Sequence, residues 1–280
     1  MKNLIKKIAF TCFSKWVKQR YFNNQGKLNW KSFHQFNFEP EILIVEDLFR
    51  DNDKGIFFDV GANKGEYIFA AEKIIPKENI YAFEPNPNLY FKLKHLFKKS
   101  HIHQLALSNQ NGDAKLKVPF LNHIEDDSLG SLKIDEKEHN ETHADFYEVN
   151  TITLDRYCYL NNVPRLDCIK IDVEGFELNV LEGGKETIKV HQPVLIIEIE
   201  KRHHEDKSIM QIAHEVCAAY SIKRKYLPYF FNHTEQKLVP LIEEPSQEQK
   251  DWGTKKYINN FVFIPEAHYF HLKVENIKPL

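Results

Sequence analysis

The sequence predicts an α/β protein whose mostly parallel sheet is covered by helices on both faces. Short apolar runs typical of buried strands alternate with segments of helical periodicity, and the first run ends in a glycine turn. This first unit predicts a strand at 56–60 and a helix over 65–75. We expect Gly61 and Gly65 to let a ligand approach the main chain, because glycine adopts backbone angles closed to other residues.

The alternation continues along the chain. Further strands are predicted at 79–83, 102–107, 166–172 and 194–200, and further helices at 87–98, 176–189 and 207–219. Two late strand-like runs, 222–227 and 257–264, have no clear helix between them, which favours an antiparallel pair that closes the sheet.

The elements divide the chain into an expected helical extension, residues 1–52, and an α/β domain, residues 53–280. The alternation breaks at residues 108–165, which is longer than an ordinary connection. This insertion reads as a strand at 115–120, a turn-rich loop at 127–132 and a charged exposed segment at 136–145. Long loops over the ends of strands carry binding sites, so we expect the substrate to be recognised here.

Composition indicates a cytoplasmic protein with one large core. The chain has 280 residues, 42% of them hydrophobic, and its four cysteines show no metal-binding spacing, which favours reduced thiols. No apolar run approaches the ~18 residues of a membrane span. Lysines interrupt the N-terminal apolar stretch, so a signal peptide is not expected.

The charge is unevenly distributed. Residues 1–38 carry eight Lys or Arg and no acidic residue, so the overall charge of −2 leaves −10 on the remainder. The acidic body argues against nucleic acid as a partner. The basic arm is interpreted as a helical cap with solvated lysines, with weak contact to the inner face of an anionic membrane as the alternative. The oligomeric state is not predicted.

The glycine turn, GANKG, matches neither the dinucleotide fingerprint nor the phosphate-binding loop of nucleotide hydrolases. Glu84 ends the second predicted strand, where a carboxylate can accept hydrogen bonds from both hydroxyls of a ribose. Pro85 and Pro87 stiffen the chain beside it. The turn and Glu84 together predict an adenosine-type ligand without a 2′-phosphate.

A second candidate site lies in KIDVEG, residues 170–175. A lysine inside a central strand is costly unless paired, so Lys170 is predicted to contact Glu198 on the next strand. Asp172 ends its strand and is expected to face the ligand crevice. Glu174 is either a general base or an acid that complements a helix dipole, and both interpretations stay open.

Histidines near this site offer another base. His203 and His204 follow the fifth strand, and an imidazole suits hydroxyl activation, although a surface loop would also explain them. His139 and His143 have Glu138 nearby but no third placed ligand, so no metal site is predicted.

Several motifs occur together in a recognisable order. They are DVGANKG (59–65), FEPNP (83–87), ALS (106–108), SL (131–132), TLD (153–155), KIDVEGFELNVLEGG (170–184) and IIEIE (196–200). Over roughly residues 55–200 the chain therefore resembles the class I S-adenosylmethionine methyltransferases, and more narrowly the FkbM family. The resemblance implies a Rossmann-like, seven-stranded class I methyltransferase sheet, mostly parallel with its last strand antiparallel, and S-adenosyl-L-methionine as cofactor.

The resemblance also implies a cofactor-binding set. Asp59 and the turn formed by Gly61, Ala62, Asn63 and Gly65 would hold the methionine end. Glu84, with Pro85 and Asn86 beside it, would hold the ribose. The loop around Leu105, Ala106 and Leu107 would flank the adenine, with Ser108 nearby, and Asp172 would face both cofactor and acceptor.

The expected reaction is methyl transfer to a hydroxyl of a sugar, a glycan or a secondary metabolite, with Asp172, Glu174 and His203 as catalytic candidates. N-methylation is the alternative within the class and would predict an acidic or aromatic amine pocket. A protein that binds the cofactor without turnover is a further alternative. A nucleotide-dependent oxidoreductase is disfavoured by the missing third glycine.

Overall fold

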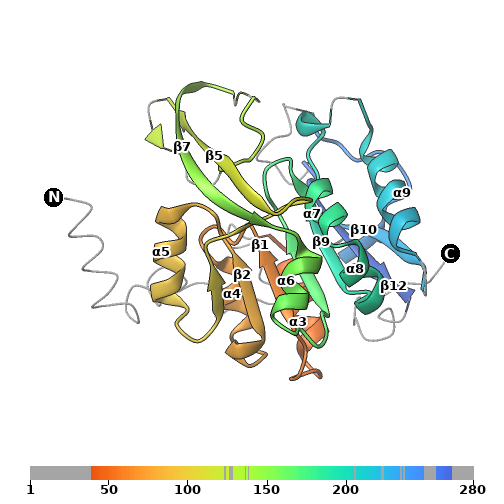
Figure 1. Ribbon diagram of the computed structural model, residues 1–280. Coiled ribbons are helices and arrows are strands. Elements are labelled where there is room, and N and C mark those ends of the chain that lie inside the picture. Colours follow the sequence, from red (N-terminus) through yellow and green to blue (C-terminus); the bar gives the residue numbers. More distant parts are fainter. Residues whose placement is uncertain are drawn as a thin grey trace.

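The computed structural model describes residues 39–122, 124–125, 129–135, 137, 139–204, 206–221, 224–233, 235, 237–248 and 257–266. Its centre is an eight-stranded sheet of order β11-β10-β12-β9-β8-β1-β2-β3 (Figure 1). The strands are β1 (Phe57–Val60), β2 (Ile80–Phe83), β3 (His101–His103), β8 (Cys168–Ile171), β9 (Val194–Glu198), β10 (Tyr226–Asn232), β11 (Lys237–Pro240) and β12 (Asn260–Pro265).

The pairing confirms a mostly parallel sheet with an antiparallel last strand. Strands β3, β2, β1, β8 and β9 pair in parallel, and β12 lies antiparallel between β9 and β10. The predicted count of seven strands is wrong by one, because β11 adds an antiparallel edge strand to β10. A strand of four residues with polar ends is too short for its periodicity to be detected.

Helices cover both faces of this sheet (Figure 1). One layer contains α3 (Ile42–Phe49), α4 (Glu66–Ala71) and α5 (Pro87–Leu96), and the other contains α6 (Leu154–Leu160), α7 (Glu177–Gly183), α8 (Lys185–His191) and α9 (Ile209–Tyr220). Successive strand residues serve opposite layers: Phe57 packs with the first cluster and Phe58 with the second. The helix predicted over 176–189 is two helices that meet at Gly184, a residue type with low helix propensity.

The insertion forms a second sheet of order β4-β7-β5-β6. Its strands are β4 (Ala106–Leu107), β5 (Gly112–Leu121), β6 (Ile124–Glu125) and β7 (Glu141–Ile152), and β5 and β7 form a long antiparallel ribbon that projects from the main sheet (Figure 1). One prediction is corrected: the strand expected at 102–107 is split between the two sheets. The charged exposed segment expected at 136–145 includes the start of β7, whose residues 141–145 are exposed or half-buried. Within β7 only Val149 is buried, so the strand lacks the apolar alternation by which a strand is recognised.

The N-terminal prediction is tested only in part. Residues 1–38, which carry the basic arm, lie outside the described residues, as do residues 222 and 223 of a predicted strand. Helix α3 lies within the predicted extension, yet its Ile44 and Phe49 are fully buried in the main core. This helix therefore belongs to the α/β domain. In the described part of the chain, every helix is too short or too polar to cross a membrane.

The structure gives a packing reason for the two glycines of the turn, Gly61 and Gly65. Gly61 has φ +79°, and a Cβ there would lie 1.7 Å from the carbonyl oxygen of Asp172. Gly65 has φ +85°, and its Cβ would lie 2.7 Å from Leu93 Cδ2. Protein atoms already occupy both Cβ positions, so close packing alone requires glycine at 61 and 65. Gly61 also lines the pocket described below, and the approach of a ligand to the main chain here stays a prediction. Gly61 allows the ends of β1 and β8 to approach each other.

We predict that Gly61→Ala destabilises the fold. The added methyl group must push β8 away and also sits in a left-handed conformation, so a loss of about 2–5 kcal/mol in the free energy of unfolding is expected. Urea denaturation of both proteins measures it. Gly112→Ala is the matched control, since Gly112 also has a positive φ but no atom within 4 Å of its would-be Cβ. Equal losses in both variants would contradict the close-contact explanation.

Candidate functional site

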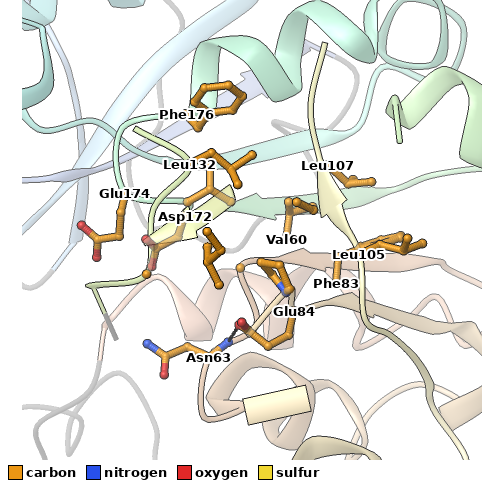
Figure 2. A pocket seen from close by; sticks show the side chains of 16 residues that line it. Val60, Asn63, Phe83, Glu84, Leu105, Leu107, Leu132, Asp172, Glu174 and Phe176 are labelled. Carbon is orange, nitrogen blue, oxygen red and sulfur yellow. Dashed lines mark hydrogen bonds between the residues drawn. The ribbon is translucent and has the colours of Figure 1, made fainter. Parts of the chain in front are cut away.

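A pocket lies at the carboxyl ends of β1, β2 and β8, where ligands bind in open α/β sheets (Figure 2). The inserted sheet closes one side of it through Leu116, Gly130 and Leu132. The remaining lining residues are Val60, Gly61, Asn63, Phe83, Glu84, Pro85, Leu105, Ala106, Leu107, Asp172, Val173, Glu174 and Phe176. The two motifs singled out in the sequence, the glycine turn and KIDVEG, therefore meet in one pocket.

Glu84 is held rigidly in the pocket wall. Its Oε2 accepts a hydrogen bond from the Asn63 N–H and its Oε1 one from the Asn86 N–H, each at 2.8 Å. Figure 2 shows the first of these bonds. Asn86 in turn caps α5, its side chain accepting from the Asn88 N–H at 2.9 Å. Each carboxylate oxygen has two acceptor positions, so Glu84 can still receive the hydroxyls of a ribose.

The rest of this end of the pocket suits a nucleoside with a charged tail. The Oδ1 atom of Asn63 is buried without a hydrogen-bond partner among the described residues, and such an atom is costly unless a ligand supplies a donor. Phe83, Leu105 and Leu107 form an apolar wall beside Glu84. A ribose, an ammonium group and a flat base would each find a matching group, so these residues fit S-adenosylmethionine.

Asp172 follows β8 and is bound to the buried Lys170, whose Nζ donates to its Oδ2 at 3.1 Å. Burial alone would raise the pKa of Asp172, but the Lys170 ammonium and a hydrogen bond from Glu198 hold it below the usual range. Lys170 also contacts Glu39 Oε2 at 3.6 Å and donates to Asn260 Oδ1 at 3.2 Å.

Lys170 forms its ion pairs within 4 Å with Asp172 and Glu39, and the predicted partner Glu198 interacts with it only as a more distant charge. Burial and the neighbouring Asp172 charge raise the pKa of Glu198 well above its ordinary value. Alternation along the strand does not distinguish between three nearby acids.

Glu174 lies in a strained turn just beyond Asp172. Its φ is +49°, and its carbonyl oxygen accepts a hydrogen bond from Ser131 Oγ, in the insertion, at 2.6 Å. Its Oε2 accepts from Arg202 Nη2 at 2.9 Å and lies 3.7 Å from His203 Nε2. Burial, assisted by the Asp172 charge, raises the pKa of Glu174 to about 7.

A different residue serves the start of α7. Glu177 is buried, and its Oε1 accepts hydrogen bonds from the Val173 and Gly175 N–H groups, both at 3.0 Å. Glu174 lines the pocket instead (Figure 2). This arrangement favours the general-base interpretation of Glu174 over the helix-dipole interpretation.

The two histidines do not lie in an exposed loop. His203 and His204 are both more than nine-tenths buried, and a Cβ on Gly175 would lie 2.8 Å from the His203 ring. Lys133 of the insertion donates to the His203 carbonyl oxygen at 2.7 Å. His203 therefore packs behind Glu174 rather than lining the pocket, and its catalytic role stays a prediction.

The predicted cofactor residues separate into two groups. Those that line the pocket are Gly61, Asn63, Glu84, Pro85, Ala106, Leu107 and Asp172, and those that do not are Asp59, Ala62, Gly65, Asn86 and Ser108. Asp59 points to the α3–α4 side with Phe57, where burial raises its pKa to about 8. Its contact with the cofactor stays a prediction.

Some members of the site were missed. Phe83, Leu116, Leu132 and Phe176 line the pocket, and Arg202 binds Glu174. Arg202 directly precedes His203 and His204 in the sequence, so a positive charge beside two candidate bases was the signal that could have identified it. Leu116 gave none, because its position depends on how the insertion folds over the sheet, whereas Leu132 belongs to the SL motif at 131–132.

The acidic cluster has spacing that a cation could bridge. Carboxylate oxygens of Asp172, Glu174 and Glu198 all lie within 4.8 Å of one another. However, Lys170 and Arg202 already supply positive charge, and the raised pKa of Glu198 keeps it protonated. The expected absence of a metal stays a prediction.

The chain shares sequence with known methyltransferases. It is 26% identical over 146 residues to the 2-O-methyltransferase NoeI of Sinorhizobium fredii, covering 48% of this chain and 58% of that protein. It is 29% identical over 148 residues to the hexuronic acid methyltransferase AglP of Haloferax volcanii, covering 50% and 53%. The match thus spans little more than half the length of these two relatives.

Among solved structures, the chain is similar to a methyltransferase FkbM from Methylobacillus flagellatus, with 13% identity and a TM-score of 0.49. The similarity covers 94% of this chain and 59% of that one. The model of the methyltransferase FkbM domain matches residues 59–238, which include the glycine turn, Glu84, the insertion and the acidic cluster. With nearly two thirds of its length matched, this chain belongs to the FkbM methyltransferase family.

Proposed function

We propose that this protein transfers a methyl group from S-adenosylmethionine to a hydroxyl group of a sugar or glycan acceptor. The observation that carries the proposal is one pocket with a rigid ribose-type acid, Glu84, at one end and a carboxyl group of pKa about 7, Glu174, at the other. The activities named for NoeI and AglP support a sugar as acceptor.

Each part of the cofactor has a residue of matching chemistry in the pocket. Glu84 would bind the ribose hydroxyls, the free Oδ1 of Asn63 would accept from the ammonium group, and Phe83, Leu105 and Leu107 would flank the adenine. When bound, the cofactor supplies an electrophilic methyl group, so the protein needs to supply only alignment and a proton acceptor.

Glu174 is the proton acceptor in this proposal. A base acts best when its pKa lies near the working pH, and about 7 meets that condition. Arg202 stabilises the carboxylate form, and His203, within 4 Å, would hold the side chain in position. Asp172 stays ionised beside Lys170 and would orient the acceptor hydroxyl as a hydrogen-bond acceptor.

Incubation with methyl-labelled cofactor and a panel of sugars tests the reaction class. The panel contains a neutral hexose, a hexuronate, an amino sugar and a simple amine, and mass spectrometry locates the added methyl group. We expect the label on a hydroxyl oxygen. Label on nitrogen, or binding of NAD without binding of S-adenosylhomocysteine, would overturn the proposal.

Glu84→Ala is predicted to weaken cofactor affinity by roughly 2–4 kcal/mol, the loss expected for charge-assisted hydrogen bonds to two hydroxyls. Calorimetric titration with S-adenosylhomocysteine measures it. Glu84 also holds the Asn63 and Asn86 N–H groups, so the melting temperature of the variant is recorded as a control for loop disorder. A folded variant with near-normal affinity would refute the assignment.

Glu174→Gln is predicted to lower single-turnover methylation by roughly 10²–10⁴-fold, the usual contribution of a general base. In the unchanged protein the rate should rise with pH through about 7 and then level off, because the deprotonated carboxylate is the active form. The variant should lose that rise and keep its cofactor affinity. A pH profile that survives in Glu174→Gln would move the base to another residue.

Asp172→Asn keeps the shape of the side chain and removes its charge. We expect methylation to fall by about 10²–10⁴-fold, and cofactor affinity to fall less than about tenfold because Glu84 and Asn63 still bind the cofactor. Single-turnover assays and cofactor titration on the same sample separate the two effects, with the exposed Asp113→Asn as a matched charge control. Equal losses of rate and affinity would make Asp172 a cofactor ligand instead.

A further inference from the structure

A second cavity, of about 420 Å³, lies on the α3–α4 side of the sheet near its carboxyl edge. It is bounded by the segment before α3, the start of α4, the end of β10 and the start of β12. Three glutamates line it, Glu39, Glu41 and Glu66, together with the aromatic side chains of Phe231 and Tyr257. Neither the pocket described above nor the proposed chemistry uses this space.

Glu41 gives the cavity an unused acceptor. The residue is only 4% exposed, and its Oε2 is buried without a hydrogen-bond partner among the described residues. A buried carboxyl oxygen in this condition costs free energy that a donor from a ligand would recover. Glu41 lines the cavity, so a ligand bound there lies beside this side chain.

The charges around the cavity favour a cation. Glu39, Glu41 and Glu66 face one basic lining side chain, His233. Lys170 is already bound to Asp172 at 3.1 Å and Glu39 at 3.6 Å, and the exposed Lys64 is the other ammonium whose charge acts on Glu66. In the described part of the chain, three acidic or histidine ligands come within 4.8 Å of one another at Asp172, Glu174 and Glu198 and nowhere in this cavity. The spacing here therefore suits an organic cation with some bulk rather than a chelated metal ion.

Lys170 connects this cavity to the reacting end of the first pocket. Its single ammonium contacts Asp172, which lines the first pocket, and Glu39, which lines the second. This ammonium thus lies between one acid of each space. An acceptor that uses both spaces must reach past it from Asp172 to Glu41.

We propose that the second cavity binds the ammonium group of the acceptor, so that the acceptor is an amino sugar methylated on a hydroxyl oxygen. This inference rests on the proposed function and specifies its substrate class. Carboxylates stabilise the protonated amine, whose nitrogen then has no lone pair for attack on a methyl group. The acidic cavity thus favours holding the amine over methylating it.

The ionisation of Glu41 and Glu66 provides a second measurable sign of ammonium binding, the release of protons. Burial, with the charge of Glu39 nearby, raises the pKa of Glu41 to about 8 and that of Glu66 to about 7. Both are partly protonated near pH 7, within a set that also includes Glu39, Lys64, Lys170, His233, Tyr67 and Tyr257. A bound ammonium lowers carboxyl pKa values, so uptake of the ligand should release protons.

The test uses the full chain and three probes of similar size: glucosamine, N-acetylglucosamine and glucose. Ligand-observed NMR at pH 7 measures affinity without methyl transfer. We expect glucosamine to bind roughly ten to a hundred times more tightly than the other two, the range of a charge-assisted hydrogen bond. Calorimetry in two buffers of different ionisation enthalpy should show proton release with glucosamine.

Glu41→Gln and Glu66→Gln should each reduce this selectivity, whereas Glu78→Gln, which removes an exposed charge before β2, should not. Equal affinity for the three sugars, or full selectivity in both cavity variants, would overturn the inference. The failures are distinguishable. If the protein methylates hydroxyl groups but binds the three sugars equally, only this inference fails. If it binds glucosamine selectively but transfers no methyl group, this inference stands and the proposed function fails.

Discussion

The buried ammonium of Lys170 is the interaction on which both cavities depend. The side chain is 2% exposed in the middle of a parallel sheet, where an isolated charge would be prohibitively costly. Asp172, Glu39 and Asn260 surround it, and these carboxylates raise its pKa despite burial. The segment before α3, the turn after β8 and the start of β12 all supply a partner. Loss of one buried partner typically costs about 3–5 kcal/mol, so the three segments are held together by a single charge.

The insertion is coupled to the same turn from the other side. Ser131 Oγ donates to the Glu174 carbonyl oxygen and Lys133 Nζ to that of His203, so two insertion residues, separated by Leu132, hold the backbone on both sides of the acidic cluster. Glu177 also stabilises this turn, because its Oε1 accepts hydrogen bonds from the Val173 and Gly175 N–H groups. A left-handed conformation at Glu174 persists only where its surroundings enforce it. A change in how the insertion packs would therefore move the proposed base as well as the pocket wall.

The limits of sequence reasoning follow from which contacts are local. The apolar runs identified most strands of the main sheet but not the edge strand β11. The position of Glu84 after β2 was enough to place it in the pocket, because strand ends meet at one edge. The partner of Lys170 was missed because Asp172, Glu198 and Glu39 all lie within reach, and burial decides which of them is ionised. Gly61 was recognised for its backbone freedom, but its contact with Asp172 joins residues more than one hundred positions apart. The cavity at Glu41 combines segments from both ends of the domain, which no motif connects.

The three carboxyl groups of the acidic cluster differ in what surrounds them, and this difference supports the roles proposed for them. The Lys170 ammonium lowers the pKa of Asp172 despite burial, burial among other acids raises the pKa of Glu198, and Glu174 has a pKa of about 7. Like charges this close cannot all ionise at neutral pH, so the three groups titrate over different pH ranges. In the proposed reaction, a proton taken from a hydroxyl would reside on Glu174, while Arg202 remains to balance Asp172. That separation of pKa values is what would let an acidic cluster act as a base near pH 7.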